Sequence, residues 1–326
     1  MKSKSLLIIG GTGFFGQSIM KYFSRSNYLK RKFKKIIIIS RSKLSKADYI
    51  KQLKKDYKLF KINCDILTLK SLPAADYVIY AGLLKNFRDD YYAVKNYIKL
   101  AKIYHSNSKI IFTSSGAVYG NESKKIGGFK ENYLDIKKKI NFNKGYKESY
   151  ANFKLKSEKL FQKLASIGIK VSIARCYAFV GEFLPLNSNF VIGNFIKNIL
   201  DRKRISICAN YQIYRSYMYS DDLVRWLLRI LDNSNTKCPI YNVGSDNKIS
   251  IHRIASVLAK KYDLDIYSPK IYSKKIDNYI PNISKAKREL KLKNNYLSLD
   301  AIIKTINLFL KKKKLGNYQG QPVSEK

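Results

Sequence analysis

A tyrosine and a lysine four positions apart, Tyr150 and Lys154, could together move a proton near neutral pH. This spacing places both side chains on one face of a helix, one turn apart. The ordinary pKa of a tyrosine is about 10, and a nearby ammonium group favours the phenolate and lowers that pKa. Ser115 could hydrogen-bond the substrate oxygen whose proton moves. With a nicotinamide to exchange the hydride, these residues would interconvert a carbinol and a ketone, and Lys154 would also hold the nicotinamide ribose.

The Tyr–Lys spacing is weak evidence by itself, because the chain has 26 Tyr and abundant Lys. The order of the segments strengthens it: a glycine-rich loop, alternating strands, a serine at a strand end, and then the Tyr–Lys pair. We predict a helix that opens at Tyr150 and runs to Leu164. Ser115, Tyr150 and Lys154 are the expected catalytic residues.

The glycine-rich loop GGTGFFG directly follows the first predicted strand. Gly10 permits a tight turn, Gly13 lets a pyrophosphate approach the backbone, and Gly16 lets the next helix pack close to the strand. The free N–H groups and the positive dipole end of that helix then face the phosphates. Glycine-rich turns also join strands to helices without any ligand, but the strand before and the helix after favour a dinucleotide site. The expected cofactor contacts in the loop are Gly10, Gly13, Phe14, Phe15 and Gly16.

Further cofactor contacts are expected where the next strands end. Arg41 follows the second strand, where a carboxylate would bind the ribose of NAD and an Arg would pair with the 2′-phosphate of NADP. We therefore expect NADP(H) in preference to NAD(H), the alternative being a surface Arg in a Lys-rich loop. Asp65 and Ile66 follow the third strand and could cover the adenine. Ala81 and Gly82 follow the fourth, where small residues admit a cofactor close to the backbone.

Strands and helices alternate in the first half of the chain, which predicts an α/β fold with a Rossmann-type doubly wound parallel sheet. Ligands of such sheets collect at the carboxyl ends of the strands, where Ser115 falls. We predict a dinucleotide-binding domain over 1–180 and a smaller α/β substrate lobe over 181–326, with some segments returning to the first domain. The predicted strands are 6–9, 36–39, 59–63, 77–80, 109–112, 171–174, 205–208 and 240–244. The predicted helices after the first are 89–104, 150–164, 190–200, 222–231 and 251–262, with a loop over 181–189 and a frayed tail over 311–326.

The 326-residue chain is 45% hydrophobic, so it can bury a substantial core. Its formal net charge is +41, from 64 Lys and Arg against 23 Asp and Glu. Because the lysines are spread over every segment, we interpret them as a solvated surface and expect no specific nucleic-acid partner. A positive field would still attract a doubly anionic sugar nucleotide or dinucleotide.

No apolar run approaches the roughly 18 residues of a membrane span, and the run before the glycine loop is too short for a secretory signal. The expectation is a cytoplasmic protein without membrane insertion and with reduced thiols. The cysteines and histidines are too widely spaced to assemble a metal site. They are Cys64, Cys176, Cys208, Cys238, His105 and His252.

The set GGTGFFG, TSSGAVYG and YANFK resembles the extended short-chain dehydrogenase/reductase family, in its NAD(P)-dependent nucleotide-sugar epimerase/dehydratase branch. The resemblance covers nearly the whole chain and implies a nucleotide-diphosphate sugar as substrate. It also implies that Arg215, in the segment RSYMY, contacts the phosphates, and that Asn189 lies in a substrate-binding loop. A surface cation is the alternative for Arg215. Ser115 counts among the substrate contacts as well. A homodimer through a four-helix bundle of 89–104 and 150–164 is implied too.

Two features depart from that branch. Its 4,6-dehydratases usually carry acidic residues directly after the catalytic Ser or Thr, where this chain has Gly116 and Ala117. Dehydration is therefore disfavoured unless Glu122 or Glu131 reaches the site. The interval between the serine and the tyrosine is also longer than the branch leads us to expect, so 124–143 is a candidate insertion beside the site.

The resulting prediction is an NADP(H)-using enzyme that reduces a 4-keto-6-deoxy-hexose nucleotide at C4, with the proton supplied by Tyr150. A nucleotide-sugar C4 epimerase is the first alternative, and a 4,6-dehydratase is the second. A catalytically retired protein that binds RNA or a membrane surface through its positive charge is the alternative outside enzymes.

Overall fold

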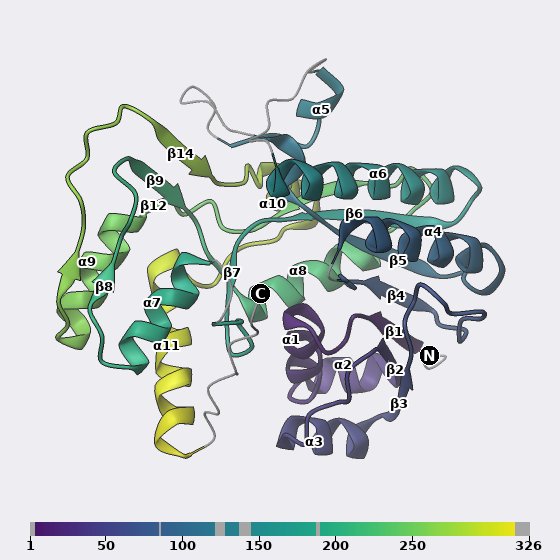
Figure 1. Cartoon of the computed structure of the whole chain (residues 1–326). Helices are drawn as coiled ribbons and strands as arrows, with labels where there is room; N and C mark the ends of the chain where they lie inside the picture. Colours follow the sequence, from purple (N-terminus) through teal and green to yellow (C-terminus); the bar gives the residue numbers. More distant parts are fainter. Residues whose placement is uncertain (1–3, 85, 121–127, 137–144, 187–189, 317–326) are drawn as a thin grey trace.

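The computed structural model describes residues 4–84, 86–120, 128–136, 145–186 and 190–316 (Figure 1). Its centre is a seven-stranded sheet with the strand order β11-β6-β5-β4-β1-β2-β3, in which every neighbouring pair is parallel. From β1 the chain continues to β2 and β3 on one side, and it then crosses back to β4 on the other side of β1. The sheet therefore has a topological switch point between β1 and β4, which is where ligands of such sheets preferentially bind. The predicted doubly wound sheet is confirmed. The strands are β1 (Lys4–Ile9), β2 (Phe33–Ser40), β3 (Lys58–Asn63), β4 (Tyr77–Tyr80), β5 (Lys109–Ser115), β6 (Lys170–Cys176) and β11 (Ile240–Val243).

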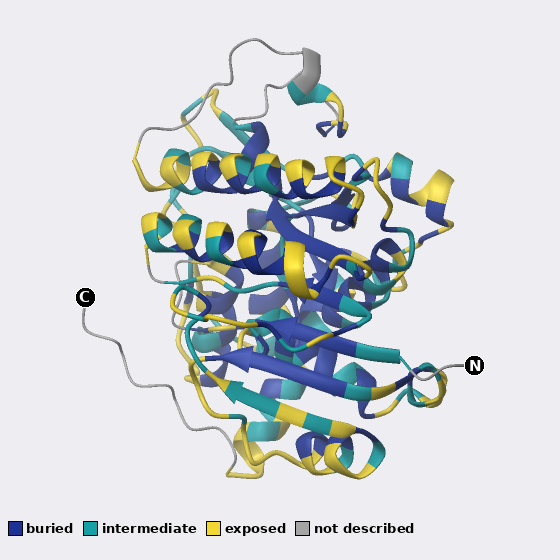
Figure 2. Cartoon of the chain, turned by 90° about the vertical axis from the view of Figure 1, so that its right-hand side faces the viewer, coloured by how far each residue is buried: buried dark blue, intermediate teal, exposed yellow. Residues whose placement is uncertain are grey.

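Alternate residues of β1 serve the two faces of the sheet. Leu6 and Ile8 pack into one hydrophobic core, and Leu7 and Ile9 into another. The central strands are buried, whereas the edge strand β3 alternates between exposed and partly buried residues (Figure 2). Helices that contribute to the first core are α1 (Phe14–Phe23), α2 (Asn27–Lys32), α3 (Asp48–Asp56), α8 (Ser220–Asp232) and α10 (Ser284–Leu290). Helices that contribute to the second are α4 (Phe87–Tyr104) and α6 (Tyr146–Ser166).

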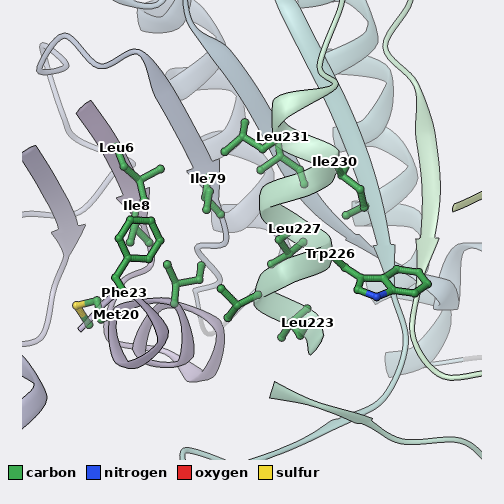
Figure 3. Close-up of a cluster of buried hydrophobic side chains, with 14 of the residues drawn as sticks. Leu6, Ile8, Met20, Phe23, Ile79, Leu223, Trp226, Leu227, Ile230 and Leu231 are labelled. Atoms are coloured by element: carbon green, nitrogen blue, oxygen red, sulfur yellow. The ribbon is translucent and has the colours of Figure 1, made fainter. Parts of the chain in front are cut away.

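Helix α8 is the clearest case of a late segment that returns to the sheet. Its apolar side, which includes Leu223, Leu227 and Ile230, shares a core with Leu6 and Ile8 of β1 (Figure 3). Strand β11 also joins the sheet beside β6. The predicted division at residue 180, with some later segments returning to the first domain, stays a prediction.

The second half of the chain builds a smaller α/β lobe with its own hydrophobic core. A three-stranded sheet of order β12-β9-β14 lies beside three helices in this lobe (Figure 1). Strand β14 pairs in parallel with β9 and carries Tyr279 opposite Arg215. The lobe's elements are α7 (Val191–Leu200), β8 (Ile205–Ser206), β9 (Gln212–Arg215), β12 (Ile249–Ser250), α9 (Ile251–Tyr262), β13 (Ile266–Tyr267), β14 (Ile276–Tyr279) and α11 (Ser298–Lys314). The connecting elements are η1 (Gly116–Tyr119), α5 (Tyr133–Ile136), β7 (Phe179–Val180) and β10 (Met218–Tyr219).

Several predicted boundaries of helices and strands are wrong. Helix α6 begins at Tyr146 rather than at Tyr150, so Tyr150 lies in its second turn. Strand β5 extends to Ser115, and the strand predicted over 205–208 ends at Ser206. The tail is helical through Lys314, because Ile302, Ile306 and Phe309 anchor α11 in the lobe's core. The prediction also missed α2, α3, α10 and most of the short strands of the lobe.

The close packing at Gly16 leads to a test of the loop. A Cβ atom on Gly16 would lie 2.3 Å from the Cα of Gly11, whereas one on Gly13 would meet nothing nearer than the Gly10 carbonyl at 3.5 Å. Gly16→Ala should therefore lower the free energy of unfolding by about 1–3 kcal/mol through overpacking. Gly13→Ala should cost less than about 1 kcal/mol. Denaturant titration of both variants measures the difference, and equal stabilities would contradict this account of the loop.

Candidate active site

The site is centred on the carboxyl end of β5, where Ser115 is the last residue of the strand. The Ser115 hydroxyl accepts a hydrogen bond from the Ala117 backbone N–H at 3.2 Å, which caps the short helix η1. Its Oγ also lies 3.5 Å from the phenol oxygen of Tyr279. Ser115 is thus held at the strand end between the Rossmann sheet and the smaller lobe.

Helix α6 packs on the same strand and supplies Tyr150 and Lys154. The Lys154 ammonium donates a hydrogen bond to the Thr113 carbonyl oxygen at 2.9 Å. It lies 5.0 Å from the ring centroid of Phe112 and 5.8 Å from that of Tyr150. Phe87 of α4 packs against the other side of Tyr150, with 5.4 Å between ring centroids. The predicted grouping of Ser115, Tyr150 and Lys154 is present in the structure, and their catalytic roles remain a proposal.

Burial sets the protonation of both residues. Burial raises the pKa of the Tyr150 phenol above its ordinary value, although a hydrogen bond with Ser115 acts in the opposite direction. In the protein without ligands the loss of hydration outweighs the hydrogen bond that favours the phenolate. The lowering of the Tyr150 pKa expected from Lys154 beside a bound nicotinamide stays a prediction. Burial lowers the pKa of Lys154 to about 8, against the opposing charges of Asp90, Cys176 and Glu158. Near neutral pH the site therefore holds a neutral phenol beside an ammonium ion.

Tyr279 is a site residue that the sequence analysis missed. Its ring packs on that of Tyr177 with 4.7 Å between centroids, and its phenol approaches Ser115. The four-residue strand that carries it contains Asp277 and Asn278, which are residue types that disfavour strands. No local pattern marks this strand, so only the pairing of β14 with β9 reveals that Tyr279 reaches the site.

Arg215, the expected phosphate contact, is already part of an ion pair. Its two terminal nitrogens donate to the two carboxylate oxygens of Asp277, each at 3.0 Å. Because Tyr279 is the strand partner of Arg215, both side chains share one face of the small sheet. The structure therefore brings Arg215 to the same side as Ser115, in a fixed orientation. Asp277, which fixes it, is a second residue that sequence reasoning missed.

The glycine loop has the features of a phosphate cradle. Gly10 has a φ of +85°, and a Cβ there would lie 2.7 Å from the backbone of Ala81 and Gly82. No side chain caps the N-terminus of α1 at Gly13, and a Cβ on Gly13 would meet only the Gly10 carbonyl oxygen, at 3.5 Å. Free N–H groups and an open cradle at a helix N-terminus fit a dinucleotide pyrophosphate. Ala81 and Gly82 lie directly against the loop, and their expected contact with the cofactor stays a prediction.

The aromatic residues of the loop are turned toward the protein. The Phe15 ring packs edge-on against Phe179 at 5.3 Å, and Phe14 packs against two of the hydrophobic cores. Their side chains anchor α1. Any contact of Phe14 and Phe15 with phosphates is therefore left to their backbone N–H groups.

Arg41 and Asp65 meet where β2 and β3 end. A terminal nitrogen of Arg41 lies 4.0 Å from a carboxylate oxygen of Asp65, and half of the Arg41 side chain is exposed. The other Asp65 oxygen accepts the Leu67 N–H at 2.9 Å, which fixes the turn before the buried Ile66. This corner therefore offers an anion a guanidinium that is only partly neutralised.

The structure leaves little room for a side chain at position 116, directly after Ser115. A Cβ on Gly116 would lie 2.6 Å from ring carbons of Tyr177, so the Tyr177 ring occupies the space that a longer side chain would need. A carboxylate at position 116 is excluded by this contact. Glu131 does not replace it, because its carboxylate accepts the Asn242 N–H at 2.9 Å within a buried network. Glu122 lies outside the described residues.

Two other predicted features are limited by the described ranges. Asn189 lies outside them, and so does most of the candidate insertion 124–143. Within the described part of the chain, no helix is long and apolar enough to cross a membrane. Over the same residues, no group of three or more His, Cys, Asp or Glu side chains could hold a metal ion.

The fold and the loop define a dinucleotide-binding α/β protein of the Rossmann type. A sequence model described as "NAD dependent epimerase/dehydratase family" matches residues 6–244, more than half of the chain. The chain belongs to this family of enzymes, which confirms the resemblance seen in its motifs. Its fold and its family agree with the predicted Rossmann-type enzyme that uses a nicotinamide cofactor.

Proteins with several different activities are similar to this chain, some in sequence and some in fold. UDP-glucuronic acid decarboxylase 3 of Arabidopsis thaliana is 25% identical over 308 residues, which cover 87% of this chain and 83% of that protein. A dTDP-glucose 4,6-dehydratase from Streptomyces venezuelae, solved with NAD bound, superposes with a TM-score of 0.78 at 17% identity, covering 95% of this chain and 98% of its own. A UDP-glucose 4-epimerase from Thermotoga maritima, solved with UDP-glucose, gives 0.74 at 19% identity, covering 95% and 99%.

The lowered pKa of Lys154 predicts a pH-dependent stability. Because the folded state disfavours the ammonium form, Lys154 destabilises the fold at low pH, and this penalty disappears as the pH rises from about 8 toward the unfolded value of 10.5. The free energy of unfolding of the wild type should therefore rise across this window relative to Lys154→Met, by roughly 3 kcal/mol at most. Lys156→Met, at an exposed position of the same helix, is the control and should show no such trend. A wild-type minus Lys154→Met difference that stays constant with pH would contradict the shift.

Proposed function

We propose that the chain exchanges a hydride at C4 of a nucleotide-linked hexose, and that its net reaction is the reduction of a 4-keto-6-deoxy sugar nucleotide with NADP(H). The observation that carries the proposal is the grouping of Ser115, Tyr150 and Lys154 at the carboxyl end of β5. When bound, the nicotinamide cofactor supplies the hydride. The residues of the chain hold the substrate oxygen and deliver the proton.

The proton moves from the Tyr150 phenol to the oxygen of the C4 ketone, and the C=O double bond becomes a C–O single bond as the hydride reaches carbon. Ser115 donates a hydrogen bond that polarises the ketone. Lys154, charged below about pH 8, stabilises the phenolate that remains until solvent reprotonates it. A neutral phenol at the start supports a proton donor, which is the role that keto reduction requires.

The substrate lobe supplies the remaining contacts in this proposal. Arg215, held by Asp277, would bind the diphosphate, and Tyr279 would border the sugar beside Ser115. Asn189 stays a proposed substrate contact. Dehydration is disfavoured because the Tyr177 ring excludes an acid at Gly116.

A second candidate is the decarboxylation of UDP-glucuronic acid, favoured by the likeness to the Arabidopsis thaliana decarboxylases. Oxidation at C4 would use the same three residues in the reverse direction. A carboxylate that is β to the new ketone can then leave as CO₂ without an acid at position 116. Epimerisation at C4 shares the same first step.

One panel of reactions tests the proposal. The purified protein is incubated with NADPH and 4-keto-6-deoxy sugars linked to UDP, GDP, CDP or dTDP, and separately with UDP-glucuronic acid and the oxidised cofactor, NAD⁺ or NADP⁺, which accepts the hydride from C4. NADPH oxidation together with a reduced sugar product is the expected result. Release of CO₂ without net NADPH consumption would replace the proposal with decarboxylation, and interconversion of C4 epimers would replace it with epimerisation.

We also propose that the chain forms a homodimer through the outer faces of α4 and α6, which pack side by side (Figure 2). Large apolar side chains stand exposed on these helices. They are Tyr92, Ile103, Tyr104 and Tyr146. Sedimentation of a monomer at micromolar concentration would contradict the dimer.

The cofactor preference can be tested at Arg41. The exposed guanidinium would pair with the 2′-phosphate of NADP(H), so Arg41→Ala should weaken NADP(H) binding by about tenfold or more and leave NAD(H) binding nearly unchanged. Arg31→Ala, which removes an exposed cation on α2, is the control for net charge. Calorimetric titration of both cofactors measures the effect. Equal loss for NADP(H) and NAD(H) would count against the preference.

A further inference from the structure

A buried ion pair lies directly behind the site. Arg175 of β6 and Glu158 of α6 are each only 3% exposed. Their contact is bidentate: the Arg175 Nη2 donates to the Glu158 Oε2 at 2.7 Å, and its Nε donates to Oε1 at 3.0 Å. Removing two charges from water is costly, so such a pair is a weak means of stabilising a fold. The pair is therefore better explained by the directional bonds that it makes to its neighbours than by a contribution to the stability of the fold.

The pair is bonded to the residue beside Ser115. The Ser114 hydroxyl donates to the Glu158 Oε1 at 2.5 Å. Glu158 stands one helical turn beyond Lys154 and two beyond Tyr150, so the three side chains share one face of α6. The Thr113 carbonyl oxygen accepts a hydrogen bond from Lys154, and the next residue, Ser114, donates one to Glu158. Two consecutive residues of β5 are thus bonded to two consecutive turns of α6.

The other end of the pair reaches the segment that follows the substrate lobe's strand β14. The Arg175 Nη1 donates to the Tyr119 phenol oxygen at 2.9 Å, and that phenol donates to the Asn242 Oδ1 at 2.8 Å. The Asn242 amide in turn donates to the Asn282 carbonyl at 3.0 Å. Asn282 lies three residues after Tyr279, whose phenol oxygen is 3.5 Å from the Ser115 hydroxyl. Directional bonds therefore run from Ser114 to this segment through buried groups.

Apolar packing alone does not fix how far a helix slides along a strand. Phe153, Phe161 and Leu164 bury α6 against the sheet, but these contacts are not directional. The bonds from Glu158 and Lys154 to Ser114 and Thr113 are directional and set the register of α6 on β5.

We propose that Glu158 and Arg175 are positioning residues for the proposed reaction: they fix the register of α6 on β5 so that Tyr150 meets Ser115, and they keep a negative charge facing the Lys154 ammonium. The inference rests on the proposed function for its kinetic test. Neither residue touches the reacting atoms. They act through Ser114 and through the face of helix α6.

Ser114→Ala is the mildest test, because it removes one hydroxyl and leaves the Arg175–Glu158 pair intact. The turnover number should fall by about tenfold or more, since a small misplacement of Tyr150 is costly, with little change in KM. Ser172→Ala is the matched control: it removes a buried hydroxyl of β6, the strand beside β5, that lies 2.8 Å from the Ser234 hydroxyl. Its turnover should stay near the wild-type value. Equal turnover of the two variants would overturn the positioning role.

Glu158→Gln provides a second readout that needs no substrate. The rate of trace acetylation of Lys154, measured against pH by mass spectrometry, reports the pKa of its ammonium. Three groups that can carry negative charge act on Lys154: Asp90 of α4, Cys176 of β6 and Glu158. Loss of the Glu158 charge should lower the pKa of Lys154 by at least about half a unit. An unchanged pKa would overturn the electrostatic part of the inference.

The two readouts separate the inference from the proposed function. A wild type that turns over no nucleotide sugar refutes the proposed function, and the acetylation of Lys154 then decides the role of Glu158. If Glu158→Gln does not fold, the comparison of Ser114→Ala with Ser172→Ala decides it.

Discussion

The site depends on how one helix is bonded to one strand. Helix α6 carries Tyr150 and Lys154, and strand β5 carries Ser115, so chemistry at the strand end requires the two elements to keep one register. The hydrogen bond from the Lys154 ammonium to the Thr113 carbonyl fixes part of this register. It also buries a cation, and that burial accounts for the lowered pKa of Lys154.

The parallel sheet places the glycine loop, Arg41 and Ser115 at one edge, near the contact between Lys154 and Thr113. The carboxyl ends of β1 and β2 bring the glycine loop and Arg41 to the edge where Ser115 ends β5, as the switch-point rule requires. The substrate lobe then adds β14 over the same edge, with Tyr279 near Ser115 and Asp277 holding Arg215. The Rossmann sheet is thus built mainly from longer, buried strands, whereas the sheet of the smaller lobe is built from short strands.

The difference between long buried strands and short strands explains which elements could be predicted from the sequence. The buried strands were found because they are short runs of aliphatic residues, and the Tyr–Lys spacing was found because about four residues make one helical turn. Strand β14 was missed because its four residues carry no alternation and include Asp277 and Asn278. The upward shift in the pKa of Tyr150 was missed because burial is a tertiary property that spacing does not encode. The prediction of a frayed tail was wrong for residues 311–314, which are helical. The apolar residues that anchor α11 in the lobe's core stabilise the helix despite the repulsion within its run of lysines.

The most direct measurement of the central claim is the turnover of Tyr150→Phe, which removes the phenol oxygen and keeps the ring. The account predicts that turnover of the nucleotide sugar falls by at least about a hundredfold, as expected for the loss of a general acid. Binding of NADP(H), followed by calorimetry on the same preparation, should stay close to that of the wild type. Turnover near the wild-type value in Tyr150→Phe would contradict the assignment of this helix and strand end as the reacting centre.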